Sequence, residues 1–348
     1  MDPFSSGAIL AEKVIASGRY CVRVFSEFNS PVAHLVSDGV ATEFDATIQH
    51  DDRIEDMGVA ADATAAQLRE LPWPIVAVMP GAETGVEVAD RLAVRLHTLN
   101  NGEKLSLARR NKYLMGETVR GAGVRAVRQK RATEWADIEA FLADWNPDPF
   151  VVVVKPIQSA GSDDVFKCLN VEEVRQAFDK INGAINGLGQ TNEGVLVQEF
   201  LDGTEYVVDS VSRDGVHKVT AVWEYDKRSV NDANFVYFGM SIRPASGEVE
   251  RALIEYSNQV LDALDIVNGP GHMEVKMCAD GPCLVEVGSR CHGGEGTWKR
   301  IADECVGYNQ IDLSLDAYVA PLPYLLSLRS GPLAMLVAFR YNEPRNNN

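Results

Sequence analysis

A pair of strand-forming segments joined by a short turn, residues 272–278 and 282–288, limits what this chain can fold into more than any other feature. Polar and apolar residues alternate in the first segment, so every second side chain, including that of Glu274, lies on one face of a strand. The Ala-Asp-Gly turn predicts a three-residue hairpin loop, and that register places Glu274 opposite Glu286. Because like charges directly across a ladder repel each other, a cation is expected between the two carboxylates.

The expected cation is Mg²⁺, or Mn²⁺ in its place. Hard divalent cations take oxygen ligands, and two carboxylates leave room in the coordination shell for phosphate oxygens. In this interpretation Glu274 and Glu286 are the protein ligands. The hairpin on its own equally fits a shifted register in which both glutamates are solvated.

Arg290 follows the second strand by two residues and is itself followed by a Cys-His-Gly-Gly-Glu-Gly loop, residues 291–296. A planar guanidinium at this position can hold a carboxylate or a developing oxyanion. Gly293 and Gly294 let the backbone approach a ligand closely, so this loop, with His292, is a candidate for the substrate side of a site. A surface arginine before a flexible loop is the alternative interpretation.

Lys155 lies at the end of a second hydrophobic strand, residues 150–156, which a proline stops. A buried lysine costs free energy unless it meets an anion. The loop that follows, residues 158–162, offers small residues and free amides of the kind that wrap phosphates. It is not a Walker A loop, because no Gly-Lys-Ser/Thr follows its glycine. A plain strand-to-turn transition with Lys155 reaching solvent is the alternative.

The stretch 197–206 joins two predicted strand systems and carries Glu199 and Glu205 on either side of an apolar connection that contains a glycine. Such a hinge can offer backbone groups and one carboxylate to an adenine, and the second carboxylate to ribose hydroxyls. Read in isolation, the stretch fits a solvated charged loop better. Glu83 in the PGAETG turn is a candidate contact for a substrate amino group or a helix cap, and residues 225–243 are a further candidate for the substrate side.

The composition is that of an ordinary globular protein, 348 residues with 46% hydrophobic residues, enough for two or three domains. The formal charge of −17 argues against nucleic acid and against an anionic membrane as partners. No apolar run approaches the ~20 residues of a membrane span, and the N-terminus has no signal segment. The six cysteines form no disulfide framework and fit no Cys-x₂-Cys zinc pair. These features predict a cytoplasmic protein.

Residues 1–103 alternate short strands with helices, and the segments 20–26 and 74–81 are typical of buried parallel strands in an α/β domain. The stretch after Met1 has the composition of a loop that follows a strand. This domain is therefore expected to lack its first strand.

Linker helices and a small lid subdomain are expected over residues 104–200, and a second subdomain with a frayed tail over residues 201–348. Ser106 is a candidate helix N-cap. Asn170 with Glu173 resembles a capping box at the start of another helix.

Several of these segments occur in the order and roughly the spacing of the ATP-grasp superfamily: Lys112 in RRNKYLM, then VVKPIQSAGSDDV, VQEFLDGTEY, HMEVK and VEVGSR. The chain is most similar to carboxylate–amine ligases of the L-amino-acid (dipeptide) ligase type, over about residues 75–318. The resemblance implies an α/β (α+β) ATP-grasp fold, in which a Rossmann-like N-terminal domain precedes two α+β subdomains that clamp ATP. It also implies an ATP-dependent ligase that joins small carboxylate and amine substrates, with L-amino acids expected, through an acyl phosphate and with release of ADP and phosphate.

The resemblance implies roles for individual residues. The ATP-binding residues would be Lys112, Lys155, Ser159, Gly161, Ser162, Glu199, Phe200, Leu201 and Glu205. The lysines would contact the phosphates, the serine–glycine loop would close over them, and the hinge residues would hold adenine and ribose. Glu274 and Glu286 would bind Mg²⁺, and Arg290 would stabilise the acyl phosphate and the tetrahedral species formed when the amine attacks. The expected substrate contacts are Glu83, His292, Gly293 and Gly294.

One position departs from the wider superfamily. Many ATP-grasp enzymes have asparagine two residues after the second metal glutamate, and this chain has Gly288. Dipeptide-type ligases often lack that asparagine too, so the difference restricts the choice of subfamily to this type. It also leaves the second Mg²⁺ with one ligand fewer. The alternatives are a non-catalytic ATP-binding protein and a ligase similar to D-alanine–D-alanine ligase or biotin carboxylase. The sequence leaves a homodimer open.

Overall fold

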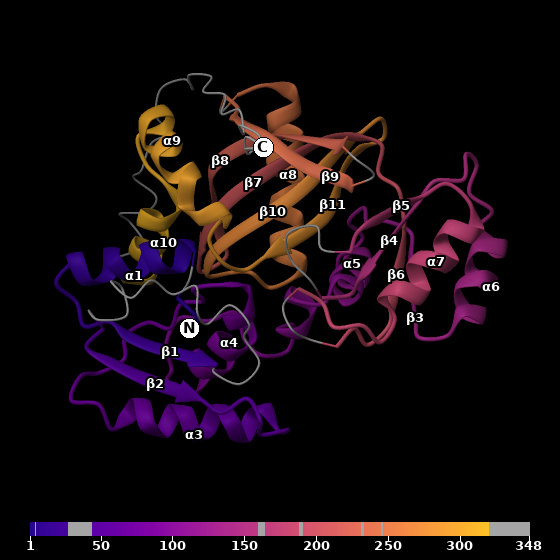
Figure 1. The fold of residues 1–348 in the computed structure, drawn as a ribbon. Helices are drawn as coiled ribbons and strands as arrows, with labels where there is room; N and C mark the ends of the chain where they lie inside the picture. Colours follow the sequence, from indigo (N-terminus) through magenta and orange to yellow (C-terminus); the bar gives the residue numbers. More distant parts are fainter. Residues whose placement is uncertain are drawn as a thin grey trace, which may run out of the picture.

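The computed structural model describes most of the chain, and Figure 1 shows an N-terminal α/β part followed by two antiparallel sheets with helices packed on them. The described residues are 1–3, 5–26, 44–158, 164–187, 191–230, 233–244 and 246–319. The tail predicted to be frayed lies outside these residues. Among the helices of the described part, none is both long and apolar enough to cross a membrane.

The N-terminal part is built on a parallel pair of strands. Its elements are α1 (Ser6–Ala16), β1 (Val22–Ser26), β2 (Ala46–His50), α3 (Met57–Arg69), the 3-10 turn η2 (Glu83–Gly85) and α4 (Val86–Arg95). Val24 of β1 is paired with Ile48 of β2, and both side chains pack with α3 and α4 in one buried cluster. Asp56 begins α3, because its side chain accepts hydrogen bonds from the first free amides of the helix.

The start of the chain lies between β1 and the segment predicted as a strand at 74–81. Asp2 N donates to Val24 O (2.9 Å), and Gly81 N donates to Met1 O (2.7 Å). Segment 74–81 is not a ladder strand, so that prediction is wrong. In the described part of the chain its backbone pairs with Met1 and with no strand of a sheet.

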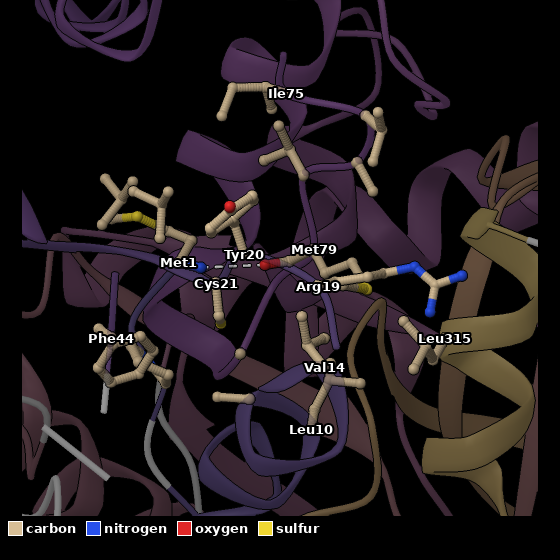
Figure 2. Close-up of a pocket in the computed structure, with 18 of the residues that line it drawn as sticks. Met1, Leu10, Val14, Arg19, Tyr20, Cys21, Phe44, Ile75, Met79 and Leu315 are labelled. Carbon is tan, nitrogen blue, oxygen red and sulfur yellow. Dashed lines mark hydrogen bonds between the residues drawn. The ribbon is translucent and has the colours of Figure 1, made fainter. Parts of the chain in front are cut away.

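An apolar cavity of about 430 Å³ separates β1 from that segment, and Figure 2 shows the side chains around it. The Met1 ammonium donates to Met79 O (3.0 Å) inside it. Leu10 of α1 and Leu315 of a C-terminal helix contribute aliphatic side chains to the wall. A lining dominated by apolar side chains does not suit a nucleotide or a metal ion.

The smaller antiparallel sheet has the strand order β3-β6-β4-β5. Its elements are β3 (Gln129–Ala132), α6 (Trp135–Trp145), β4 (Val152–Pro156), β5 (Phe166–Cys168), α7 (Val171–Ile181) and β6 (Val195–Glu199). Both helices pack against the sheet through one apolar cluster that includes Ile138 and Phe178. The predicted cap at Asn170 is confirmed, since its side chain accepts a hydrogen bond from Glu173 N (2.9 Å).

The larger antiparallel sheet has the order β11-β10-β7-β8-β9. Its strands are β7 (Gly203–Arg213), β8 (Val216–Val230), β9 (Ala233–Ile242), β10 (Gly269–Cys278) and β11 (Gly281–Gly288). The accompanying helices and 3-10 turns are η3 (Leu107–Arg109), α5 (Lys112–Gly121), α8 (Glu248–Ala263), η4 (Gly294–Gly296), α9 (Thr297–Val306) and α10 (Gln310–Val319). The predicted N-cap at Ser106 is wrong: Asn111 caps α5 by accepting from Leu114 N (3.0 Å), and Ser106 Oγ donates to Asp90 instead.

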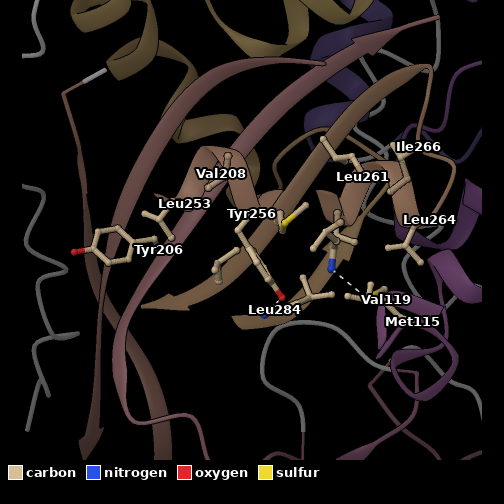
Figure 3. Packing of buried hydrophobic residues seen from close by; sticks show 14 of the residues in the cluster. Met115, Val119, Tyr206, Val208, Leu253, Tyr256, Leu261, Leu264, Ile266 and Leu284 are labelled. Atoms are coloured by element: carbon tan, nitrogen blue, oxygen red, sulfur yellow. Dashed lines mark hydrogen bonds between the residues drawn. The ribbon is translucent and has the colours of Figure 1, made fainter. Parts of the chain in front are cut away.

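The two faces of the larger sheet pack against different helices. Tyr206 and Val208 of β7 face α5 and α8, and Figure 3 shows this cluster. Val207, between them, points to the other face and packs with residues of α1, α9 and α10. Because side chains alternate along a strand, Glu205 and Asp209 share that second face with Val207. The charged residues of the site lie there.

Candidate active site

The two glutamates predicted to share a metal ion face each other on neighbouring strands. Glu274 of β10 is paired with Glu286 of β11, so the predicted register is confirmed. The predicted three-residue loop is wrong, because Cys278 pairs with Gly281 and leaves two residues in the turn. A bulge next to Glu274 shifts the register by one residue and brings the glutamates into line.

Two lysines lie close to Glu286. Lys112, the first residue of α5, places Nζ 2.9 Å from Glu286 Oε2. Lys155 of β4 is only 4% exposed, and burial together with repulsion from Lys112 lowers its pKa to about 8. Burial raises the pKa of Glu286, but Lys112 and Lys155 lower it more, to about 2. This corner therefore holds an ionised carboxylate beside two cationic side chains.

Glu274 shares a lysine with Glu205. The ammonium of Lys227 on β8 contacts Glu205 and lies 3.3 Å from Glu274 Oε2. Tyr237 OH donates to Glu274 Oε1 at 3.4 Å, and Lys276 Nζ lies 3.8 Å from Glu205 Oε2. Burial raises the pKa of Glu274, and the charge of Lys227 opposes this shift without reversing it. Positive charge is thus already placed beside each of the two facing carboxylates.

The residues predicted for adenine and ribose lie where the two sheets meet. Glu199, Phe200, Leu201 and Glu205 all line a cavity of about 100 Å³ at this junction. Glu199 Oε2 accepts a hydrogen bond from Arg128 N (3.0 Å), while Glu205 is buried in β7. The phosphate loop, with the predicted residues Ser159, Gly161 and Ser162, lies outside the described residues.

A larger cavity of about 780 Å³ adjoins the first. The two cavities share the lining residues Lys112, Tyr237, Glu274 and Glu286. The predicted substrate residues Glu83, His292, Gly293 and Gly294 line the larger cavity together with Arg290. The structure therefore brings the predicted metal, catalytic and substrate residues to one connected space.

Arg290 and Glu83 form a charged wall of this larger cavity. Arg290 Nε donates to Glu83 Oε2 (2.7 Å), and Arg110 Nη1 donates to Glu83 Oε1 (2.5 Å). Burial raises the pKa of Glu83, but the two guanidinium groups, Arg290 first, lower it more, so the pKa ends below its usual value. The carboxylate therefore stays charged and holds Arg290 in a fixed direction.

A buried carboxylate holds two histidines at the side of the same cavity. Asp209 Oδ1 lies 2.9 Å from His272 Nδ1, and Oδ2 lies 2.8 Å from His292 Nδ1. Trp223 Nε1 donates to Asp209 (2.8 Å), and Tyr225 OH lies 3.1 Å from His292 Nε2. Ligand atoms around a tetrahedral zinc ion, each ~2.0–2.1 Å from the metal, would be about 3.3 Å apart. The observed separations are shorter and are those of hydrogen bonds.

The sequence assigns no role to Asp209 or His272, and it includes Lys227 only within the candidate stretch 225–243. Alternation along β7 puts Asp209 on the same face as Glu205, and alternation along β10 puts His272 on the same face as Glu274. That signal could have found two of the three residues. It does not reveal that β7 and β10 are neighbours, which the distance between them along the chain conceals.

Comparisons with known proteins identify the family of this chain. A model described as the ATP-grasp domain matches residues 148–299. The chain is 35% identical over 330 residues to dapdiamide A synthase of Enterobacter agglomerans, covering 94% of this chain and 74% of that relative. It is similar in fold to an L-amino acid ligase from Bacillus licheniformis, with a TM-score of 0.69 and 20% identity over 92% of this chain and 72% of that one. The ADP complex of N5-carboxyaminoimidazole ribonucleotide synthetase has a TM-score of 0.68 and 16% identity over 97% of this chain and 78% of that one.

The fold places two antiparallel sheets side by side, with lysines and two facing carboxylates where they meet. The chain belongs to the ATP-grasp family of carboxylate–amine ligases. The predicted fold and enzyme class are therefore confirmed: this is an ATP-dependent ligase that forms carbon–nitrogen bonds between small molecules. The relationship favours the predicted ligase over the non-catalytic alternative.

Proposed function

We propose that this ligase joins the carboxylate of an L-amino acid to an amine, with a second L-amino acid as the amine substrate, through an acyl phosphate. The observation that carries the proposal is the meeting of the two cavities at Lys112, Glu274 and Glu286. ATP held against the hinge residues that border the smaller cavity would present its γ-phosphoryl group at this junction. A carboxylate in the larger cavity would reach it from the other side. The names of two similar proteins, dapdiamide A synthase and L-amino acid ligase, are consistent with amide formation from amino acids.

The nucleotide side needs positive charge on the phosphates and a fixed adenosine. Lys112 and Lys155 would neutralise the phosphate oxygens as the γ-phosphoryl group is transferred. Glu199, with the backbone of the two residues after it, would hold the adenine, and Glu205 the ribose. A lysine with its pKa lowered to about 8 by burial becomes fully charged again when an anion binds beside it, which supports the assignment of Lys155.

The carboxylate pair fits a divalent cation. Glu274 and Glu286 are opposed across a ladder, and each has a lysine ammonium within 3.3 Å of a carboxylate oxygen. Hard oxygen donors arranged in this way suit Mg²⁺ or Mn²⁺. When bound, such an ion supplies positive charge to the phosphate oxygens and orients them for in-line transfer.

On the acyl side, Arg290 is the catalytic residue of this proposal. Its guanidinium would stabilise the acyl phosphate and the oxyanion of the tetrahedral species. Glu83, which holds Arg290 at 2.7 Å, fixes its direction and offers a negative charge to a substrate ammonium group. The glycines at 293 and 294 let backbone groups of the following loop approach the substrate.

The test of this function is ATP consumption with Mg²⁺ and pooled L-amino acids, with ADP, AMP and phosphate resolved. Amino-acid-dependent release of ADP and phosphate, with a new amide detected by mass spectrometry, is the expected result. Release of AMP and pyrophosphate would mean adenylation and would overturn the acyl-phosphate mechanism. Tight nucleotide binding without any amino-acid-dependent turnover would overturn the choice of substrates.

The affinity for ATP is expected to fall as the pH rises above about 8. In the free protein Lys155 loses its proton near that pH, whereas bound phosphate favours the protonated form and raises its pKa. Below pH 8 both states are protonated, so this group leaves affinity unchanged. Above it the free protein must take up a proton on binding, and affinity falls by up to ~10-fold per pH unit. Calorimetric titration with a non-hydrolysable ATP analogue measures the slope.

A Lys155→Arg variant is the control for this pH dependence. Arginine keeps its charge throughout the range, so the variant is expected to bind the analogue with no loss of affinity that starts near pH 8. An identical slope in both proteins would show that another group titrates, and the role given to Lys155 would be wrong.

A further inference from the structure

The amine substrate must lose a proton before it can react, and the roles given above name no residue that accepts this proton. Near neutral pH an amino group is an ammonium ion, and it cannot attack an acyl phosphate until a base takes its proton. We propose that Tyr225 receives this proton and passes its own to His292, which Asp209 holds in position. The inference rests on the ligase function proposed for the same site.

The hydrogen bonds fix the direction in which a proton can move. Burial raises the pKa of Asp209, but His292 and His272 lower it more, so the carboxylate is ionised and accepts hydrogen bonds. In the neutral form that the relay uses, His292 Nδ1, 2.8 Å away, donates to this carboxylate, and the lone pair is on Nε2. Tyr225 OH, 3.1 Å from that nitrogen, then donates to it. Burial keeps the pKa of Tyr225 well above its usual value, so the phenol carries a proton to pass on.

The imidazole of His292 is held from several sides. Its backbone N–H donates to Gln310 Oε1 (2.7 Å), and its ring stacks on that of Trp298 with centroids 5.3 Å apart. The Tyr225 ring packs edge-on against Tyr237 at 5.3 Å. Neither ring has to move for the proton transfer, as an efficient relay requires.

Tyr225 and His292 also lie where the amine must approach. Both line the 780 Å³ cavity, which is also lined by Arg290 and by Glu286 at the phosphate end. His292 follows Arg290 by two residues, so one loop places the group that faces the acyl phosphate and the group that accepts the proton. An amine that attacks an acyl carbon beside Arg290 therefore enters the cavity that Tyr225 borders.

The atoms of the step balance as follows. A bond forms between the amine nitrogen and the acyl carbon, and the bond from that carbon to the phosphate oxygen breaks, its electron pair leaving with inorganic phosphate. One ammonium proton moves to the oxygen of Tyr225 while the Tyr225 proton moves to Nε2 of His292. The nitrogen loses its second proton to solvent as the tetrahedral species collapses to the amide. The imidazolium that results faces the charge of Asp209, and it returns its proton through Tyr225 to the departing phosphate.

A purely structural network would behave differently. Asp209 is fully buried, and its bonds to His272, His292 and Trp223 connect three strands with the loop after Arg290. If the network only held these strands and the loop in place, a substitution in it would slow the reactions of all amine acceptors at the site by the same factor. A proton relay matters only for an acceptor that arrives protonated.

Hydroxylamine separates the two roles, because it is unprotonated at neutral pH and needs no base before it attacks. The experiment compares wild-type protein and Tyr225→Phe with Mg²⁺, ATP and pooled L-amino acids, with and without hydroxylamine, and measures dipeptide and hydroxamate. Tyr225→Phe is expected to lower dipeptide formation by ~10²-fold, the typical effect of losing a general base, and to leave hydroxamate formation nearly unchanged. His292→Gln is expected to give the same pattern.

Tyr237→Phe is the matched control, since Tyr237 lines the same cavity and packs against Tyr225. It is expected to change both products in the same proportion. If Tyr225→Phe also changes both in proportion, or changes neither, the relay is overturned while the ligase function stands. A wild-type protein that forms neither product would overturn the proposed function and the relay with it.

Discussion

Replacing Glu286 with glutamine is expected to lower kcat for amino-acid-dependent ADP release by ~10³-fold. Glu286 lies 2.9 Å from Lys112, and the charges of Lys112 and Lys155 hold its pKa at about 2 in spite of its burial. An amide in its place leaves two lysines without the charge that both face, and it weakens the proposed metal site by one anionic oxygen ligand. Steady-state ADP release with pooled L-amino acids measures the loss.

The matched control is Glu224→Gln on β8. Glu224 is 38% exposed and pairs with Arg243 at 3.1 Å, away from both cavities of the site. Its removal is expected to leave kcat within about twofold of wild type, because an exposed ion pair contributes little. If Glu286→Gln kept more than about a tenth of the wild-type kcat, Glu286 would not be a metal ligand during transfer of the γ-phosphoryl group.

The part of the site that the sequence could predict depends on short-range geometry. Alternation within β10 and a three-residue turn predict Glu274 opposite Glu286. The turn in the structure has two residues instead of three. The predicted pairing is nevertheless confirmed, because the bulge next to Glu274 shifts the register by the one residue that the shorter turn removes.

Other features depend on which segments become neighbours in space. Asp209 acquires its role only because β10 and the loop after Arg290 bring two histidines from more than 60 residues away. Ser106 is a residue type that often caps helices, but its hydroxyl donates a hydrogen bond to Asp90, and Asn111 is the N-cap of α5. A segment such as 74–81 becomes a strand only if a neighbouring strand pairs with it, whatever its pattern of apolar residues. Periodicity describes each segment alone, so it cannot predict which segments become neighbours.

Replacing Arg109 with methionine is expected to lower the free energy of unfolding by ~3–5 kcal/mol, the cost of breaking a buried ion pair on one side. Arg109 is fully buried, and its Nη2 lies 3.0 Å from Asp90 Oδ2. Its Nη1 donates to Leu264 O (3.0 Å), so the side chain connects α4 of the N-terminal part with the end of α8. Methionine fills similar space but removes the positive charge that faces the buried Asp90 carboxylate and the donor to the Leu264 carbonyl. Urea unfolding, followed in parallel by fluorescence and circular dichroism, measures the change.

Further variants decide whether the Arg109–Asp90 ion pair causes the loss of stability in Arg109→Met. Asp62→Ala removes one partner of Arg95 in a pair whose Asp62 side chain is 68% exposed, and it is expected to cost at most ~1 kcal/mol. The double variant Arg109→Met with Asp90→Leu removes both buried charges, so no unpaired carboxylate is left inside, and it is expected to be more stable than Arg109→Met alone. Asp90→Leu alone completes the comparison. If the double variant lost the sum of the effects of Arg109→Met and Asp90→Leu, the two charges would not be coupled. The cost of Arg109→Met would then come from lost packing and from the orphaned carbonyl of Leu264.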